Sequence, residues 1–326
     1  MIKSAVVGCG YLGKFHAEKY YKSKNSELVA VVDPDESIAK KTAKSCKCDY
    51  LQDYKELPAL GVQCASVAST TSTHYEIAKW LLENGIDVLV EKPMTTTIEE
   101  GEELVEIAKT NGRIIQAGHL ERFNPAFLEM KKTAQNPWFF EVRRIAQFTG
   151  RGADVDVVLD LMIHDIDIIS HLVGKPVEKI EAVGIPVLTQ SVDIANARIT
   201  FEGGAIANVT ASRAAYKSER TFRVFQPNVY MSLDFGKKKL KIYTKQGQSD
   251  KLSLSNVSVK EVKIKERDAL EHEIESFVAS VRDRSEPAVS GEDGVRALEL
   301  VHKVKEAFSL SMQRLEPELM LAAQGE

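Results

Sequence analysis

Cysteine is scarce in this sequence, with four residues among 326. That number is too small for a scaffold built on disulfides. Cys46 and Cys48 are separated by one residue, which is not the CxxC spacing of a redox pair. No second pair of ligands follows them at zinc spacing, so we expect no metal site. Cys9 and Cys64 lie in a glycine-rich turn and an apolar run, where small packing side chains are expected.

The sequence also has no large excess of one charge and no long apolar run. Its formal net charge is -4 and its isoelectric point is about 6.1, which argues against general binding of nucleic acids or anionic membranes. No segment approaches the length of a membrane span, and the N-terminus carries no secretory signal pattern. We therefore expect a cytoplasmic protein with no nucleic-acid partner and no membrane insertion.

Apolar runs alternate regularly with helical patterns over the first 118 residues. This alternation predicts an α/β fold in which residues 1–118 form an N-terminal Rossmann domain, a doubly wound parallel sheet that binds a dinucleotide. The predicted strands are 2–7, 28–32, 62–68, 86–90 and 113–117, and the predicted helices are 11–23, 36–45, 73–83 and 97–111.

After Gly118 the pattern changes to alternating β-formers joined by turn residues. It predicts a C-terminal α+β domain, residues 119–326, with an open, mostly antiparallel sheet. The length of the chain fits two such domains. The predicted strands are 138–148, 177–188, 193–201, 205–213, 220–226, 229–235 and 239–244, and the predicted helices are 125–134, 157–172, 268–284 and 291–314.

The first predicted strand runs into a glycine-rich turn that precedes a predicted helix. Gly8 permits a tight turn, Gly10 leaves room between the backbone and a pyrophosphate, and Gly13 lets helix and strand pack closely. The helix N-terminus adds free N–H groups and the positive end of a dipole. The GxGxxG pattern in this context predicts a dinucleotide site that includes Tyr11 and Leu12.

Asp33 ends the second predicted strand, twenty residues after Gly13. A carboxylate at this position accepts hydrogen bonds from the ribose of the adenosine half and repels a 2′-phosphate. It therefore favours NAD over NADP as the cofactor. The alternative role for this acidic segment is to cap the helix that begins near Glu36, a role that suits Asp35.

Two further polar turns follow predicted parallel strands, at residues 69–70 and 91–93. Ligands bind at the carboxyl ends of such strands, so we expect both turns at the same edge of the sheet as the glycine-rich turn. Lys92 is then expected near the nicotinamide half. The candidate cofactor-binding residues in and after these turns are Ser69, Thr70, His74, Glu91 and Lys92.

The helical segment within the second half carries Asp160 and His164, four residues apart. In an α-helix these two side chains share a face, so the carboxylate can orient the imidazole. A histidine held in this way can accept a proton from a hydroxyl near neutral pH. Taken alone, such a pair is more often a helix-surface contact. Asp165 and Asp167 are expected to face solvent or a neighbouring loop.

Together these motifs resemble the glucose-fructose oxidoreductase, inositol dehydrogenase and rhizopine-catabolism (Gfo/Idh/MocA) family along nearly the whole chain. The shared features are the GxGxxG turn, Asp33, residues 68–74, the Glu-Lys-Pro sequence at 91–93 and the DxxxH pattern at 160–164. The resemblance implies that Lys92, Asp160 and His164 form the active site and that the Lys-Pro bond is cis. It also implies a homodimer or homotetramer formed through the C-terminal sheet.

The chemistry of alcohol oxidation agrees with these roles. A hydride leaves a secondary carbinol carbon only as the hydroxyl proton departs, so the site needs a proton acceptor and a positive charge beside the developing alkoxide. We assign His164 as the base and Asp160 as the group that orients it. Lys92 either supplies the charge or acts as the base itself, and the sequence leaves these two roles open.

Within the family, residues 118–125, 192–198 and 208–213 resemble the bacterial UDP-N-acetylglucosamine 3-dehydrogenases. This resemblance implies a nucleotide-sugar substrate that is oxidised at its 3-hydroxyl. A diphosphate favours cationic side chains. Arg151 and Arg220 are weaker candidates for that contact, because a surface arginine is usually only solvated. The preferred substrate-binding candidates are His119, Arg122, Asn124 and Arg213.

Two other functions remain open at this stage. A free-sugar or inositol dehydrogenase would use the same catalytic residues without a diphosphate to bind. A nucleotide-sensing regulator without turnover would need the glycine-rich turn and Asp33 but no proton acceptor. The presence of Lys92, Asp160 and His164 together argues against the regulator.

Overall fold

The computed structural model describes residues 1–148, 155–246 and 256–312. The chain packs into two compact units. The first comprises Met1–Asn124 and Arg267–Leu298, and the second comprises Pro125–Glu266 and the chain from Glu299 onward. The division into a cofactor domain of residues 1–118 and a substrate domain of residues 119–326 stays a prediction, because it is defined by the ligand of each domain.

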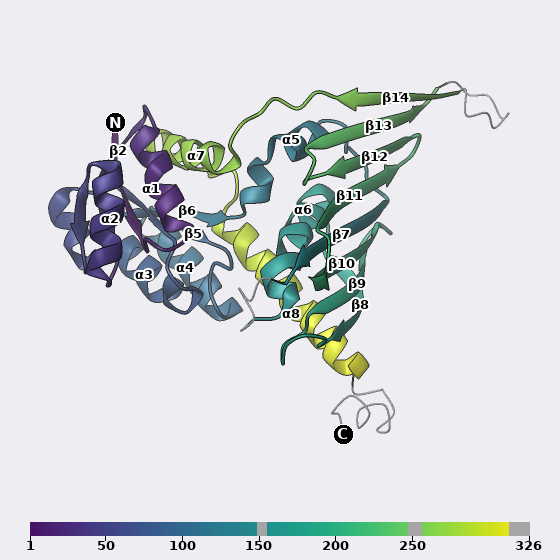
Figure 1. Ribbon diagram of the computed structural model, residues 1–326, viewed down its shortest axis with the longest axis horizontal. Helices are drawn as coiled ribbons and strands as arrows, with labels where there is room; N and C mark the ends of the chain where they lie inside the picture. The colour runs from purple at the N-terminus through teal and green to yellow at the C-terminus, as the bar shows by residue number, and fades with distance from the viewer. Residues whose placement is uncertain (149–154, 247–255, 313–326) are drawn as a thin grey trace. The chain divides into compact units, whose positions relative to one another are not determined.

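The first unit contains a six-stranded parallel sheet in the order β3-β2-β1-β4-β5-β6 (Figure 1). The predicted Rossmann-type alternation is confirmed, and the strand order reverses at β1, where such folds bind their ligand. Its elements are β1 (Ile2–Val7), α1 (Gly13–Lys22), β2 (Ser26–Val32), α2 (Glu36–Cys46), β3 (Asp49–Leu51), η1 (Tyr54–Leu60), β4 (Cys64–Val67), α3 (Thr71–Glu83), β5 (Asp87–Glu91), α4 (Ile98–Thr110), β6 (Ile115–Gly118), η2 (Leu120–Phe123) and α7 (Ala269–Asp283).

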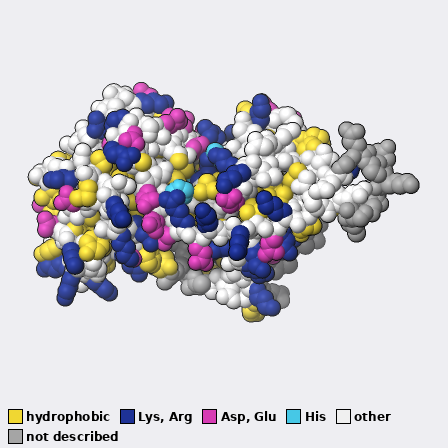
Figure 2. Space-filling view, turned by 90° about the horizontal axis from the view of Figure 1, so that it is seen from above, with side chains coloured by type: hydrophobic (Ala, Val, Ile, Leu, Met, Phe, Trp, Pro, Cys, Tyr) yellow, Lys and Arg dark blue, Asp and Glu magenta, His cyan; other side chains and the backbone are white. Residues whose placement is uncertain are grey.

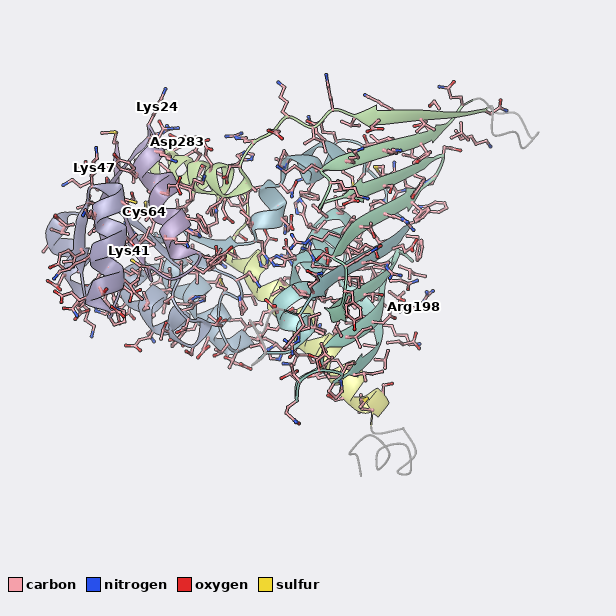
Figure 3. All side chains as sticks on the ribbon, viewed as in Figure 1. Lys24, Lys41, Lys47, Cys64, Arg198 and Asp283 are labelled. Carbon is pink, nitrogen blue, oxygen red and sulfur yellow. The ribbon has the colours of Figure 1, made fainter. Side chains whose placement is uncertain are left out.

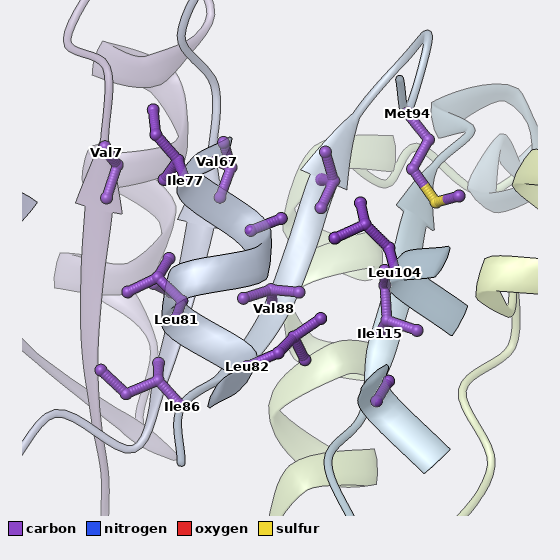
Figure 4. Close-up of a cluster of buried hydrophobic side chains, with 14 of the residues drawn as sticks. Val7, Val67, Ile77, Leu81, Leu82, Ile86, Val88, Met94, Leu104 and Ile115 are labelled. Carbon is purple, nitrogen blue, oxygen red and sulfur yellow. The ribbon is translucent and has the colours of Figure 1, made fainter. Parts of the chain in front are cut away.

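Apolar side chains cover both faces of this sheet. On one face α3 and α4 pack against the strands through residues such as Leu81 and Leu104 (Figure 4). On the other face α1, α2 and α7 pack against the strands, with Tyr20 and Ile274 fully buried. The helix α7, from the C-terminal part of the chain, thus contributes to the core of the first unit.

Sequence reasoning did not find three short elements of this unit, namely β3, η1 and η2. β3 is a three-residue edge strand with no buried residue, so it leaves no apolar run in the sequence. η1 is a 3₁₀ helix that contains Pro58, and 3₁₀ turns lack the 3.6-residue periodicity of an α-helix.

The second unit contains an eight-stranded sheet in the order β14-β13-β12-β11-β7-β10-β9-β8. Every neighbouring pair is antiparallel except β7 with β10, which confirms the predicted mostly antiparallel sheet. Its elements are α5 (Pro125–Lys131), β7 (Phe139–Gln147), η3 (Val158–Met162), α6 (Ile163–Val173), β8 (Val177–Ile185), β9 (Ile194–Phe201), β10 (Ile206–Ala215), β11 (Glu219–Gln226), β12 (Val229–Asp234), β13 (Lys239–Lys245), β14 (Val257–Val262) and the part of α8 (Gly291–Met312) from Glu299 onward.

The strand β14 was not predicted, because half of its six residues are polar or charged. The predicted end of the last helix, at residue 314, lies outside the described residues. In the part of the chain that the structure describes, no helix is both long and apolar enough to cross a membrane.

The two faces of the second sheet differ. The helices α5, α6 and α8 lie on one face (Figure 1), and Arg198 projects from the opposite face (Figure 3). That outer face carries a line of half-buried aromatic rings across four strands. The ring centroids of Phe139 and Phe225 lie 5.5 Å apart, those of Phe225 and Tyr230 4.7 Å, and those of Tyr230 and Tyr243 4.9 Å.

Candidate active site

The glycine-rich turn has the geometry that a dinucleotide requires. Gly8 has a φ of +92°, and a Cβ there would lie 2.5 Å from the backbone nitrogen of Ser69. A Cβ on Gly13 would lie 1.7 Å from the Gly8 carbonyl oxygen, whereas a Cβ on Gly10 would meet nothing within 4 Å. The turn thus packs tightly on its inner side and is open at Gly10, where a pyrophosphate can approach. The α1 N-terminus has no side-chain cap, so the positive end of its dipole is left to favour an anion.

Asp33 braces this turn from the end of β2. Its Oδ2 accepts a hydrogen bond from the Cys9 N–H at 2.8 Å, and its Oδ1 accepts one from the Asp35 N–H at 3.0 Å. A carboxylate offers about four acceptor positions, so Asp33 retains capacity for ribose hydroxyls. Asp35 accepts from the N–H groups of Ser37 and Ile38 and therefore caps α2. Asp35 thus takes the capping role that the sequence suggests for it, and the contact of Asp33 with the ribose stays a prediction.

A cavity of about 700 Å³ opens beside the turn. The predicted cofactor residues Gly8, Gly10, Tyr11, Leu12, Asp33, Ser69 and Thr70 line it. Sequence reasoning missed the rest of the lining, because much of it lies on η1 and its flanks or in the first turns of α3. These further lining residues include Gln52, Asp53, Tyr54, Thr73, Glu76 and Ile77. The cavity's size and its mixed apolar and polar walls fit the adenosine half of NAD.

The Glu91-Lys92-Pro93 turn follows β5 in the same unit, and its Lys92–Pro93 peptide bond is cis, as expected. Glu91 is buried and is hydrogen-bonded at both oxygens. Its Oε1 lies 2.8 Å from the Nε2 of His16, and its Oε2 accepts the Lys92 N–H at 3.2 Å. The Lys92 side chain is half-buried. His74 is also buried, with Nδ1 3.0 Å from the Pro93 carbonyl oxygen and Nε2 3.2 Å from the Ser69 carbonyl oxygen.

Burial would by itself raise the pKa of the Glu91 carboxyl, but the hydrogen bond and charge of His16 and the Lys92 N–H outweigh it and lower that pKa. Glu91 is therefore ionised at neutral pH. Burial lowers the pKa of His74, with partial compensation from the two carbonyl groups beside it. Whether Glu91 and His74 also contact the cofactor stays a prediction.

In the second unit, Asp160 and His164 lie on a helix that is not a regular α-helix. Asp160 belongs to the π-helical stretch η3, and His164 lies in the first turn of α6. Both side chains are half-buried. The shared face expected from α-helical spacing does not apply strictly across this junction, and π-helical insertions often occur at functional sites. The pairing of these two side chains stays a prediction.

Asp165 and Asp167 are expected to face solvent or a neighbouring loop, and for solvent this expectation is wrong. Their exposed fractions are 1% and 2%. The guanidinium of Arg144, on β7, binds Asp165 in a bidentate manner, with Nε to Oδ2 at 2.8 Å and Nη2 to Oδ1 at 2.9 Å. Because α6 packs on the sheet and is buried around most of its circumference, even its polar positions are buried and need partners.

The predicted substrate ligand Arg213 is buried as well. Its Nε donates to Asp193 Oδ1 at 2.7 Å, its Nη1 to the Val155 carbonyl at 2.7 Å, and its Nη2 to Thr189 Oγ1 at 3.0 Å. Asp193 Oδ2 also accepts the backbone N–H groups of residues 187–189. Although burial opposes ionisation, these hydrogen bonds and Arg213 hold the pKa of Asp193 well below its usual range. This ion pair fixes a loop, and a role in substrate binding stays a prediction.

The other predicted substrate residues lie in the first unit, just after β6. His119 and Arg122 are buried, and Arg122 Nη2 lies 3.5 Å from Asp293 Oδ1. The side-chain amide of Asn124 donates to Glu121 at 3.0 Å. The weaker candidate Arg220 is exposed, and Arg151 lies outside the described residues.

On the face shown in Figure 2, basic and acidic side chains are interspersed. Within residues 1–148, 155–246 and 256–312, no group of three or more His, Cys, Asp or Glu side chains is arranged to hold a metal ion.

Comparison with known proteins gives matches along both units. A model described as an oxidoreductase family with an NAD-binding Rossmann fold matches residues 2–119, and a GFO/IDH/MocA C-terminal domain model matches residues 125–227. UDP-N-acetylglucosamine 3-dehydrogenase of Acidithiobacillus ferrooxidans is 32% identical, over 96% of this chain and 99% of that protein. A solved structure of the same enzyme matches with a TM-score of 0.87, over 94% of this chain and 97% of the other.

Inositol dehydrogenases are more distant relatives. The NAD(+)-dependent scyllo-inositol 2-dehydrogenase of Bacillus subtilis is 29% identical, over 66% of this chain and 68% of its own. The myo-inositol 2-dehydrogenase of Thermotoga maritima is 25% identical, over 94% of this chain and 96% of its own.

Proposed function

This chain belongs to the Gfo/Idh/MocA family of NAD-binding oxidoreductases, and from that premise we propose that it oxidises the 3-hydroxyl of UDP-N-acetylglucosamine to a ketone. The observation that supports this substrate is the 32% identity to a UDP-N-acetylglucosamine 3-dehydrogenase over almost the full length of both chains. The inositol dehydrogenases match at lower identity or over less of the chain.

NAD, when bound, accepts the hydride that leaves the carbinol carbon. The residues that would hold it are the glycine-rich turn and the α1 N-terminus for the pyrophosphate, and Asp33 for the adenosine ribose. Asp33 opposes a 2′-phosphate through its negative charge, which favours NAD over NADP.

Three side chains carry the proton chemistry in this proposal. His164 accepts the proton of the substrate hydroxyl, and Asp160 orients its imidazole. The Lys92 ammonium stabilises the developing alkoxide, or Lys92 itself accepts the proton. His119, Arg122, Asn124 and Arg213 are proposed to serve the nucleotide sugar, directly or by ordering the segments around it.

A free inositol or sugar is the second candidate substrate, and it is favoured by the matches to inositol dehydrogenases. The third hypothesis is a nucleotide-sensing regulator without turnover. The presence of Lys92, Asp160 and His164 argues against it. The first two candidates differ in the diphosphate, so UDP is a diagnostic competitor.

The experiment measures NADH formation at 340 nm with purified protein, NAD and a panel of UDP-N-acetylglucosamine, UDP-glucose, myo-inositol, scyllo-inositol and glucose. We expect turnover of UDP-N-acetylglucosamine with competitive inhibition by UDP. Turnover of an inositol that millimolar UDP does not affect would transfer the assignment to the second candidate. NAD binding with no turnover of any of these alcohols would favour the regulator.

We also propose that the enzyme is a homodimer or homotetramer in the cytoplasm. The outer face of the eight-stranded sheet supports the assembly, since its line of four aromatic rings is only half-buried in the single chain. The four cysteines are free thiols, which suits a reducing compartment. Light scattering of the parent protein and of Tyr230→Glu tests the interface, and a monomeric parent would contradict it.

A further inference from the structure

Two buried histidines that the proposed mechanism does not use hold the Glu91-Lys92-Pro93 turn from either side. His16 is 0% exposed and His74 is 1% exposed. His16 lies on α1, directly after the glycine-rich turn, and His74 lies in the first turn of α3. Buried polar side chains are retained where their hydrogen bonds are made, so the partners of these two rings indicate what they do.

His16 connects α1 to the backbone of Lys92 through Glu91. Its Nε2 lies 2.8 Å from Glu91 Oε1, and the other carboxylate oxygen accepts the Lys92 N–H at 3.2 Å. The second ring nitrogen lies 3.1 Å from Ser66 Oγ, which in turn lies 3.0 Å from the Tyr20 hydroxyl. Both ring nitrogens therefore have hydrogen-bond partners, and the imidazole holds the residue before Lys92.

His74 fixes the residue after Lys92. Its Nδ1 lies 3.0 Å from the Pro93 carbonyl oxygen, and its Nε2 lies 3.2 Å from the carbonyl oxygen of Ser69. Ser69 belongs to the turn that lines the NAD cavity and that contacts the inner side of Gly8. The lysine turn is thus tied to the cofactor turn by His74 as well as by α1.

A second buried glutamate near Glu91 differs from it in its hydrogen bonds and in its charge. Glu273, on α7, is 0% exposed, and its carboxyl oxygens have no hydrogen-bond partner among the described residues. Burial raises the pKa of Glu273 well above its ordinary value, and the charge of Glu91 raises it further. Glu91 is thus the ionised, hydrogen-bonded member of the pair, and Glu273 is a neutral acid that does not hold the lysine turn. This contrast supplies a matched control.

We propose that His16, acting through Glu91, and His74, acting through the Pro93 carbonyl, are positioning residues that hold Lys92 in register with the NAD-binding turn. The inference rests on the proposed role of Lys92 in the reaction. A displacement of about 1 Å at a reacting group can cost roughly a hundredfold in rate. Two anchors on adjacent residues hold the lysine backbone against such a displacement.

The test is a double-mutant cycle between His74→Leu and Lys92→Met, read as kcat at saturating substrate and NAD. We expect His74→Leu to lower kcat by roughly tenfold or more in the parent and to have almost no effect in Lys92→Met, because the anchor acts only through the lysine. If His74→Leu lowered kcat by the same factor in the parent and in Lys92→Met, its role would be merely structural and the inference would be overturned. The same cycle with His16→Leu tests the other anchor.

Conservative variants separate positioning from folding. His16→Gln retains a donor toward Glu91, so its kcat is expected to lie between those of the parent and His16→Leu. Glu273→Gln, which changes a neutral acid to a neutral amide near Glu91, is expected to leave kcat within about twofold of the parent. If Glu273→Gln lowered kcat as much as Glu91→Gln does, any change near these two buried carboxyl groups would impair the enzyme, and the inference would fail.

A substrate-independent measurement separates failure of this inference from failure of the proposed function. Acetylation of Lys92 by acetic anhydride is followed by mass spectrometry, with the exposed Lys24 as internal reference (Figure 3). We expect the half-buried Lys92 to react at least about threefold faster in His16→Leu and His74→Leu, and at the parent rate in Glu273→Gln. Unchanged labelling in all variants contradicts positioning, whereas normal turnover of Lys92→Met contradicts only the catalytic role of Lys92.

Discussion

At the scale of single residues, neighbouring side chains of one chemical type have different functions here. Asp33 and Asp35 are two residues apart, yet one braces the glycine-rich turn and the other caps a helix. Glu91 and Glu273 are both buried carboxyl groups, yet one is ionised and the other neutral. In each pair the hydrogen-bond partners within reach decide the role. Cys9 for Asp33 and His16 for Glu91 are partners from distant parts of the sequence.

The first residue-scale prediction concerns the cofactor. Asp33→Ala should weaken NAD binding by about 1.5 to 3 kcal/mol, because hydrogen bonds to a charged group are lost. Asp35→Ala is the matched control, since it should lose about 1 kcal/mol of stability through the helix cap and leave NAD affinity unchanged. Calorimetric titration measures the NAD affinity of both variants. Equal affinity of the parent for NAD and NADP would contradict the role of Asp33.

The second concerns the proton chemistry. Lys92→Met and His164→Ala should each lower kcat roughly a hundredfold or more, with NAD affinity nearly intact, because they act on the developing alkoxide. Asp160→Asn should have a smaller effect if it only orients the imidazole. Stopped-flow and steady-state rates on the same preparations provide the measurement. Near-parental turnover in both Lys92→Met and His164→Ala would place the chemistry elsewhere.

The third is a pH dependence of stability. In the unfolded chain Glu273 ionises near its ordinary pKa, whereas in the folded protein the raised pKa keeps its proton bound. The folded state then binds more protons than the unfolded state. Through this group the free energy of unfolding therefore falls as the pH rises above that ordinary pKa, by up to about 1.4 kcal/mol per pH unit. Glu273→Gln should therefore gain stability over the parent at pH 8 but not at pH 4. Urea unfolding at both pH values should reveal this, and a pH-independent difference would refute it.

At the scale of elements, periodicity and motif context predicted the Rossmann strands and most of the second sheet. They predicted the position of Asp160 and His164 but not the π-helical stretch, because a π-bulge leaves no periodic pattern of its own. They also did not predict that Arg144 and Arg213 are held in buried ion pairs. An arginine on a strand looks alike in sequence whether it binds solvent, a carboxylate or a ligand, and only the packing of α6 and of the loop near Asp193 separates these cases.

The element-scale prediction follows from the pair that fixes the loop after β8. Asp193→Asn and Arg213→Met should each lower the free energy of unfolding by about 3 to 5 kcal/mol, because each leaves an uncompensated buried charge or its hydrogen-bond partners unpaired. Denaturant titration gives this value, and substrate kinetics give the KM. A raised KM for UDP-N-acetylglucosamine in Arg213→Met at unchanged stability would instead favour direct binding of the diphosphate.

At the scale of the whole molecule, the chain comprises a first unit whose core includes helix α7 and a second unit built on a broad sheet. The first unit carries the NAD cavity and the anchored Lys92 turn, and the second carries Asp160 and His164. That these residues carry the chemistry stays a prediction. The return of residues 267–298 to the first unit was not predicted, because the apolar face of an amphipathic helix does not specify the surface that it covers.

In the proposed reaction a hydride leaves carbon 3 of UDP-N-acetylglucosamine and is taken up by NAD. Its most direct test uses UDP-N-acetylglucosamine deuterated at carbon 3, incubated with the purified protein and NAD, with the NADH analysed by mass spectrometry. We expect NADH that carries one deuterium and a nucleotide sugar that has lost it. NADH without deuterium, or no NADH while an inositol is oxidised under the same conditions, would contradict the claim.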